Sequence, residues 1–108
     1  MTFEVILTAD AARDLVDIVD FIAAQDAPDK AQHVLDRIER AFAGLAENPE
    51  RGAHPRELLS LGIREYREVF FMPYRILYQV AETRVMVMLI ADGRRDMQTL
   101  LQRRLLAP

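Results

Sequence analysis

The order of apolar and polar residues predicts one strand and two helices in the first half of the chain. Residues 2–8 alternate and place Phe3, Val5 and Leu7 on one face, which favours a short strand. The apolar residues that follow recur at helical spacing and form one stripe: Leu15, Ile18, Val19 and Ile22. After a break around Pro28, a second helix carries its own stripe: Ala31, Val34, Leu35, Ile38, Phe42 and Leu45. Two amphipathic helices joined by a short turn form a hairpin that can cover one face of a sheet.

The second half of the chain has the pattern of a small sheet closed by a helix. Residues 48–57 contain two prolines and one glycine, which predicts a loop. Three strands follow at residues 63–71, 74–80 and 85–91, and a last helix spans residues 97–106. The third strand is almost continuously apolar, which is typical of a strand buried on both faces. We therefore expect an α+β fold of order β-α-α-β-β-β with a C-terminal helix, in which the helical hairpin packs on a small antiparallel sheet.

Length and composition exclude several classes of protein. The 108 residues suit one domain that spans the whole chain, residues 1–108. Cysteine is absent, which excludes disulfides and thiolate metal sites, and two histidines are too few for an obvious metal cluster. We therefore expect neither a metal nor a cofactor. No apolar run approaches the roughly 18 residues that span a membrane, and the N-terminus lacks the pattern of a signal peptide, so we expect a cytoplasmic protein without membrane contact.

Charge divides the chain into an acidic and a basic part. Residues 1–60 carry six basic and twelve acidic side chains, whereas residues 61–108 carry eight arginines and five acidic side chains. Five of these arginines lie on the predicted strands or just after them: Arg64, Arg67, Arg75, Arg94 and Arg95. We expect that they can converge on one sheet surface and hold a phosphate backbone or an acidic protein segment. Local pairing with Glu65, Glu68 and Asp96 is an equally good interpretation of the charge pattern. No hydroxyl group lies in a recognisable nucleophile motif.

Three segments together resemble a known family. They are a strand of sequence Met72-Pro73-Tyr74-Arg75-Ile76-Leu77-Tyr78-Gln79-Val80, a Gly93-Arg94-Arg95 ending after the last strand, and an Asn48-Pro49-Glu50-Arg51-Gly52 loop. With the order of elements, this pattern resembles the RelE/ParE superfamily of toxins from type II toxin–antitoxin systems, and the loop is more similar to the ParE branch. The resemblance covers nearly the whole chain.

The RelE branch consists of metal-independent endoribonucleases that cut messenger RNA on the ribosome. Resemblance to this branch implies that Arg67, Arg75 and Arg95 stabilise the charged transition state. Two positions depart from its pattern, because Val69 stands where the branch has a lysine and Leu101 where it has a tyrosine. Leucine cannot move a proton, so the general acid–base chemistry of the branch is lost here.

The ParE branch poisons DNA gyrase through protein–protein contact, and we expect this chain to act in that way rather than as an enzyme. The alternative is the ribosome and messenger RNA as targets. Both interpretations imply a cognate antitoxin whose C-terminal arm covers the helices and the sheet edge; DNA is contacted only through that antitoxin. We expect antitoxin or target contacts at the five arginines and on the first helix: Arg64, Arg67, Arg75, Arg94, Arg95, Leu15, Ile18 and Ile22. The sequence is compatible with two roles for the stripe of the first helix, as part of the core or as part of an antitoxin groove.

Overall fold

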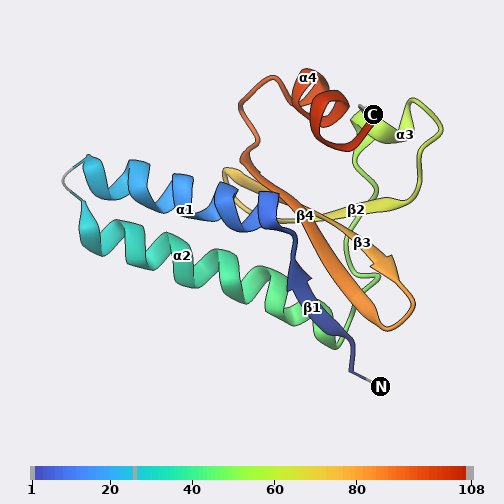
Figure 1. Ribbon diagram of the computed structural model, residues 1–108, viewed down its shortest axis with the longest axis horizontal. Helices are drawn as coiled ribbons and strands as arrows, with labels where there is room; N and C mark the ends of the chain where they lie inside the picture. The colour runs from blue at the N-terminus through green and yellow to red at the C-terminus, as the bar shows by residue number, and fades with distance from the viewer. Residues whose placement is uncertain (1, 26, 107–108) are drawn as a thin grey trace.

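The computed structural model describes residues 2–25 and 27–106 and has the expected α+β architecture (Figure 1). The strands are β1 (Glu4–Leu7), β2 (Tyr66–Phe71), β3 (Tyr74–Ala81) and β4 (Arg84–Asp92). The α-helices are α1 (Ala9–Ala24), α2 (Pro28–Ala43), α3 (Arg56–Leu59) and α4 (Met97–Leu101). A 3-10 turn, η1 (Gly44–Ala46), follows α2, and a π-helical segment, η2 (Gln102–Leu106), continues α4. Among the described residues, no helix is both long enough and apolar enough to cross a membrane.

The predicted helical hairpin is confirmed. The Thr8 side chain accepts a hydrogen bond from the Ala11 amide and so caps α1, while Pro28 opens α2. Both apolar stripes face the sheet, and their most buried members are Leu15 and Ile22 on α1 and three residues on α2: Ala31, Val34 and Ile38.

The sheet has the strand order β1-β4-β3-β2 and is mixed rather than antiparallel throughout. The predicted antiparallel arrangement is confirmed for β2, β3 and β4. It is wrong for β1, which pairs in parallel with β4 in the register Glu4 opposite Arg84 to Leu7 opposite Val87. A parallel pair needs a long crossover connection, and the helical hairpin and the two intervening strands provide it.

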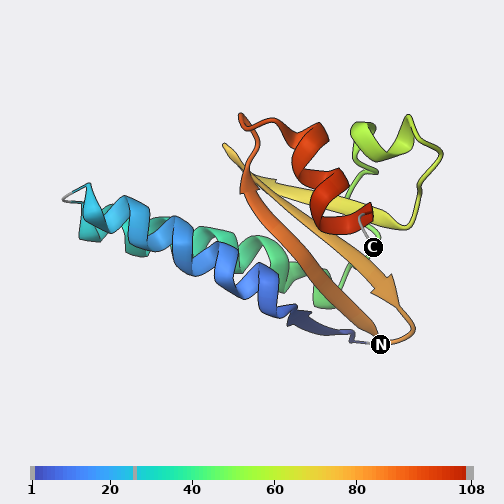
Figure 2. The ribbon, with the colours of Figure 1, turned by 45° about the horizontal axis from the view of Figure 1, so that its top comes forward.

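β4 contributes side chains to two cores, and a register shift within it changes which residues face each core. Leu77 lies opposite Leu89 but Tyr78 lies opposite Val87, so Met88 is an extra residue that reverses the alternation of side chains. Before the shift, Val87 belongs to the core under α1 and α2; after it, Leu89 belongs to the core under α3 and α4. Figure 2 shows α4 on the opposite side of the sheet from α1 and α2. The continuous apolar run of β4 therefore reflects burial on both faces, as predicted.

Two predicted boundaries differ from the structure. The strand predicted at residues 63–71 begins only at Tyr66, because α3 runs into a turn in which the Ile63 amide donates to the Leu58 carbonyl and Gly62 has a φ of 78°. Arg64 therefore lies outside the sheet. The helix predicted at residues 97–106 is present, but it is an α-helix only to Leu101 and a π-helix beyond.

Candidate functional site

Arg75 lies at the centre of a compact ion-pair cluster on the α3–α4 side of the sheet. Its Nη1 and Nη2 atoms donate to the two carboxylate oxygens of Glu57, both at 2.8 Å, and its Nε atom donates to Glu68 at 2.7 Å. The side chains of Arg75, Glu57 and Glu68 are only 12, 15 and 8 % exposed. Each of the three guanidinium nitrogens thus donates to a carboxylate in a largely desolvated position.

Three elements bring this cluster together. Arg75 lies on β3 opposite Phe70, so that Glu68 on β2 is its diagonal neighbour on the same face. Glu57 comes from the first turn of α3, which packs over this face. Gly93 leaves the space that the arginine stem needs, since a Cβ atom there would lie 2.8 Å from the Arg75 Cδ atom.

The cluster favours the charged forms of Glu57 and Arg75. The hydrogen bonds from Arg75 lower the pKa of Glu57 below its ordinary value, and the hydrogen bond to Glu57 raises the pKa of Arg75 further. One cation faces two anions, so the cluster carries a net negative charge at neutral pH. It does not present a free guanidinium to a phosphate group.

A pocket of about 460 Å³ opens beside this cluster. Its walls combine apolar and basic side chains with the buried ion pair: His54, Arg56, Glu68, Phe70, Met72, Pro73, Arg75, Gly93 and Arg94. Phe70 and Met72 are 49 and 76 % exposed. The Nδ1 atom of His54 lies 3.0 Å from the Tyr66 carbonyl oxygen, and the described residues contain no group of three potential metal ligands.

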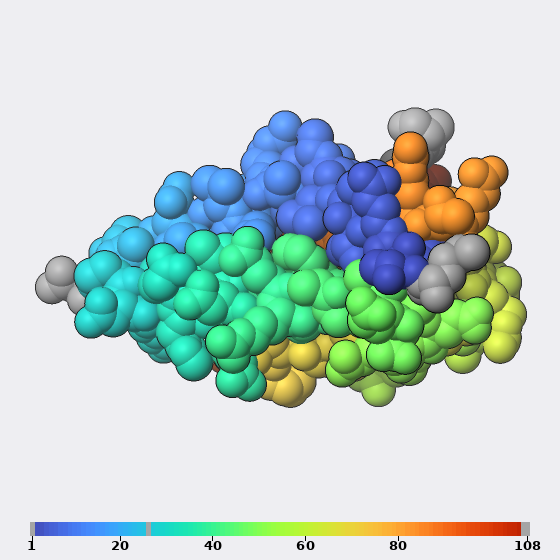
Figure 3. Space-filling view, turned by 90° about the horizontal axis from the view of Figure 1, so that it is seen from below, coloured from blue at the N-terminus to red at the C-terminus, as the bar shows by residue number. Residues whose placement is uncertain are grey.

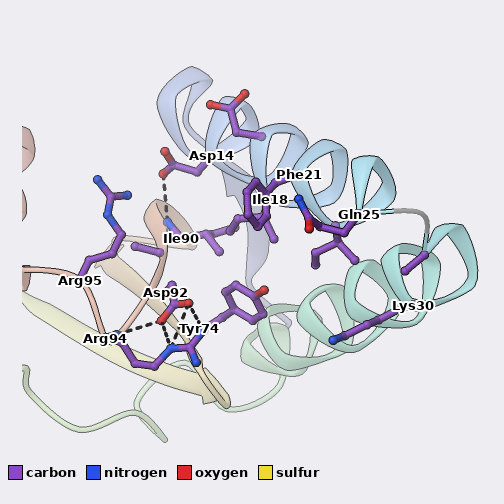
Figure 4. Close-up of a pocket in the computed structure, with 14 residues that line it drawn as sticks. Asp14, Ile18, Phe21, Gln25, Lys30, Tyr74, Ile90, Asp92, Arg94 and Arg95 are labelled. Atoms are coloured by element: carbon purple, nitrogen blue, oxygen red, sulfur yellow. Dashed lines mark hydrogen bonds and ion pairs between the residues drawn. The ribbon is translucent and has the colours of Figure 1, made fainter.

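A second cavity, larger than the first, is a groove of about 610 Å³ between the helical hairpin and the C-terminal end of β4 (Figure 4). Ile18, Phe21 and Ala27 supply apolar surface, and Phe21 is 68 % exposed. Charged side chains of both signs line the same groove: Asp14, Asp17, Asp92, Lys30, Arg94 and Arg95. A groove with an apolar strip between charges of both signs suits a polypeptide rather than a small substrate.

Asp14 fixes one end of this groove. It accepts a hydrogen bond from the Ile90 amide at 3.0 Å and is held by both Nη atoms of Arg104. Arg104 also donates to the carbonyl of Met88, the extra residue of β4. β1 pairs with β4 only as far as Val87. Past that residue, side chains of α1 and of the C-terminal segment cover the same edge of β4.

The predicted convergence of five arginines on one sheet surface is wrong. Arg67 lies on the same face of β2 as Val69, which packs under the helical hairpin. The Nη1 atom of Arg67 donates to the carbonyls of Glu50 and Gly52. Arg75 lies on the same face of β3 as Leu77, which is the opposite face of the sheet, under α3 and α4. Alternating residues of adjacent strands point to opposite sides, so these two guanidiniums cannot share a ligand.

The other three arginines divide between the groove and the solvent. Arg94 and Arg95 line the groove, and Arg94 is paired with Asp92 at 2.6 Å while its side chain remains 77 % exposed. Arg64 is exposed in the segment before β2. Of the acidic partners considered from the sequence, Glu68 does pair with Arg75, whereas Asp96 caps α4 through Thr99.

The apolar residues of the α1 stripe have two different roles. Leu15 and Ile22 are 8 and 7 % exposed and pack in the core of this chain, although Ile22 also borders the groove. Ile18 is half-buried and lines the groove. Of the three residues predicted as contacts, Ile18 is therefore the one best placed to touch a partner.

The sequence matches the family described as "ParE toxin of type II toxin-antitoxin system, parDE" over residues 5–97. The chain belongs to the ParE toxin family. Membership confirms the superfamily inferred from the strand and loop motifs. No curated protein matches the sequence significantly.

Solved structures of toxin–antitoxin complexes share the fold of this ParE-family chain. One is the chromosomal ParDE system from P. aeruginosa, with a TM-score of 0.70 and 19 % identity over 84 % of this chain and 96 % of that chain. Another is the RelBE2 complex from Mycobacterium tuberculosis, with a TM-score of 0.58 and 24 % identity over 85 % of this chain and 99 % of that chain. Both similarities concern the fold.

Several important residues of the site were not predicted from the sequence. Glu57 stood in a loop-like segment, and nothing in its surroundings indicated a bidentate pair with an arginine 18 residues away. Asp14 belonged to a row of aspartates that looks like a solvated helix face, and Arg104 to a basic tail. The only available signal was that Asp14 lies next to Leu15 at the border of the apolar stripe.

Proposed function

We propose that this ParE-family toxin inhibits DNA gyrase by protein–protein contact and is neutralised by a cognate antitoxin. The observation that carries the proposal is the state of Arg75. A ribonuclease of the RelE type needs a cation that is free to stabilise the developing charge on phosphate. Here Glu57 and Glu68 occupy all of the short contacts of that guanidinium.

The two residues that differ from the RelE pattern support the same conclusion. Val69 and Leu101 are 6 and 1 % exposed, and each packs in one of the two cores. Neither can donate or accept a proton, so these two positions supply no acid–base catalysis. A toxin that acts by binding needs no such catalysis.

The groove along α1 is the best candidate for the antitoxin. An antitoxin arm that carries apolar anchors between charged residues would meet Ile18 and Phe21, with Arg94 and Arg95 at one side. Two solved structures with a similar fold are described as toxin–antitoxin systems, which supports an antitoxin as a partner.

Two assays with the purified toxin test the proposal. In the first, supercoiling by DNA gyrase is measured with increasing toxin; we expect inhibition that is relieved by the antitoxin encoded beside the toxin gene. In the second, translating ribosomes are probed for cleavage of messenger RNA in the A site; we expect none. Cleavage of transcripts without any effect on gyrase would refute the proposal and establish the ribonuclease alternative.

Variants of two arginines sharpen the test. A ribonuclease that uses Arg75 and Arg95 would lose activity in both Arg75→Lys and Arg95→Ala. For a gyrase inhibitor we expect Arg75→Lys to keep its toxicity as long as the fold is retained, as measured by circular dichroism. The matched control is Arg103→Ala, because Arg103 is exposed like Arg95 but lies outside the groove.

A further inference from the structure

A basic surface lies where the C-terminal half of α2 meets the end of β2. An open cavity of about 330 Å³ marks it, and three arginines and two phenylalanines dominate its lining: Arg37, Arg40, Arg51, Phe70 and Phe71, with Ala41. Figure 3 shows this side of the molecule, where gold atoms at the end of β2 and the start of β3 emerge beneath α2. We call Arg37, Arg40 and Arg51 the arginine triplet.

The arginine triplet is a site of positive charge in a chain whose net charge is -3. All three residues are exposed. Across residues 2–25 and 27–106, the ion pairs within 4.0 Å involve other arginines, namely 13, 75, 84, 94 and 104. The acidic residues next to the triplet on α2, Asp36 and Glu39, are turned away by about 100° around the helix. With Arg40 they line a separate depression.

The helix α2 positions two members of the triplet. Arg37 and Arg40 are three residues apart, which makes them neighbours on the helix surface. The Arg37 guanidinium lies over the Phe71 ring at 5.4 Å from its centroid. Because this cation–π contact already restricts the Arg37 side chain, less conformational entropy is lost when it binds an anion.

A loop that is pinned to the sheet positions the third member. The Gly52 amide, next to Arg51 in the chain, donates to the Tyr78 hydroxyl at 3.0 Å. The Nη1 atom of Arg67 donates to the carbonyls of Glu50 and Gly52 at 3.2 and 2.8 Å. Arg67 therefore supports the loop on both sides of Arg51 and adds a further positive charge beside it.

We propose that the arginine triplet binds the phosphate backbone of duplex DNA without reading its sequence. Guanidiniums offer paired donors to phosphate oxygens, and duplex DNA carries about one negative charge per 1.7 Å of its axis. Contacts with phosphates position a protein on the duplex but carry no sequence information. This contact is direct, unlike the expected contact of DNA through the antitoxin, and it does not depend on gyrase being the target. It would also concentrate the toxin near an enzyme that acts on DNA, a consequence that rests on the proposed function.

A single-stranded nucleic acid fits this surface less well than a duplex. Single strands gain affinity by stacking their bases on aromatic rings. Phe71 is not available for stacking, since Arg37 covers its ring and His33 approaches it edge-on at 6.2 Å. The surface therefore offers charge to a backbone rather than a platform to bases.

The salt dependence of DNA binding tests the proposal. The toxin is titrated into a labelled DNA duplex at increasing salt concentrations, and fluorescence anisotropy gives the association constant. If each of the three arginines contacts one phosphate, the logarithm of this constant falls with the logarithm of the salt concentration with a slope of about -2.7. A second duplex of unrelated sequence should give the same constant and slope.

Variants of the triplet show which residues make the contact. For Arg37→Gln/Arg51→Gln we expect a slope of about -0.9 and binding that is about tenfold weaker at low salt, because two phosphate contacts are lost. The matched control is Arg84→Gln/Arg103→Gln, which removes the same charge from exposed arginines outside the cavity. Its slope should stay close to that of the wild type. Circular dichroism verifies that both double variants are folded.

Equal weakening in the control would show that DNA responds only to overall charge and would overturn the proposal. So would absence of duplex binding at low salt, a clear preference for one duplex sequence, or tighter binding of a single strand of the same length. Binding of a polyglutamate peptide through the triplet, without binding of the duplex, would assign the surface to an acidic protein instead. The gyrase assay is separate from these measurements, so this proposal and the proposed function can fail independently.

Discussion

Asp14 and Arg104 are joined by a bidentate ion pair that ties the first helix to the C-terminal segment, with bonds of 2.9 and 3.0 Å. The pair closes over the edge of β4, where Asp14 also accepts from Ile90 and Arg104 also donates to Met88. The two side chains are 18 and 20 % exposed, so the contacts are largely removed from water. This contact fixes the C-terminal segment against the rest of the fold.

We expect Arg104→Ala and Asp14→Ala each to lower the free energy of unfolding by about 2–3 kcal/mol, since each leaves a partly buried charge unpaired. The measurement is urea denaturation, and the double variant should lose less than the sum of the single losses. Arg103→Ala is the matched control, and its change should stay within about 0.5 kcal/mol. Additive losses in the double variant would contradict direct coupling.

Glu57 gives the protein an acid-sensitive contribution to stability. Its pKa is lowered in the folded state by Arg75, so this stabilisation is complete above the ordinary value near 4.5 and is lost as the pH falls through the lowered value. Glu57→Gln should therefore be less stable than the wild type at pH 7, and the gap should shrink as the solution is acidified below about pH 4.5. Denaturation curves across this pH range check it, with exposed Glu65→Gln as the control.

Phe21 and Val16 form a matched pair for testing the α1 groove. Both are exposed apolar residues of α1, 68 and 56 % exposed, but only Phe21 lines the groove. We expect Phe21→Ala to weaken antitoxin binding about tenfold and Val16→Ala to leave it nearly unchanged, because an aromatic anchor in a groove contributes more than a residue outside the contact. Isothermal titration calorimetry with the cognate antitoxin gives both values. Equal effects would place the antitoxin elsewhere.

Gly52 and Tyr78 hold the loop before α3 against the sheet. The Gly52 amide donates to the Tyr78 hydroxyl at 3.0 Å, and a Cβ atom at Gly52 would lie 2.5 Å from the Glu68 carbonyl oxygen. We expect Gly52→Ala to destabilise the fold by about 2–3 kcal/mol through this clash and Tyr78→Phe by about 1 kcal/mol through the lost hydrogen bond. Thermal unfolding tests both. Gly44→Ala, where only the flexible tip of Arg51 is close, should change stability little.

The sequence by itself determined the helical hairpin, the four strands and the C-terminal helix, their order, and the family, but not the short helix α3. Helices and strands could be predicted because they depend on the spacing of apolar residues that are close in the sequence. This spacing forms the stripes of α1 and α2 and the alternation of the strands. The Tyr74-Arg75 strand and the Asn48–Gly52 loop carry enough specific positions to indicate the superfamily. Two further positions, Val69 and Leu101, favoured the ParE branch, because neither side chain can transfer a proton.

Only the tertiary structure decided what the arginines do. Arg67 and Arg75 are eight residues apart with a turn between them, and whether they share a face depends on the pairing register of β2 and β3. Arg75 meets Glu57 through the packing of α3 on the sheet, and Arg104 meets Asp14 across most of the chain. Charge composition indicated a basic half of the chain, but the ion pairs of Arg75 and Arg104 are long-range contacts, and their partners are set by how the layers pack.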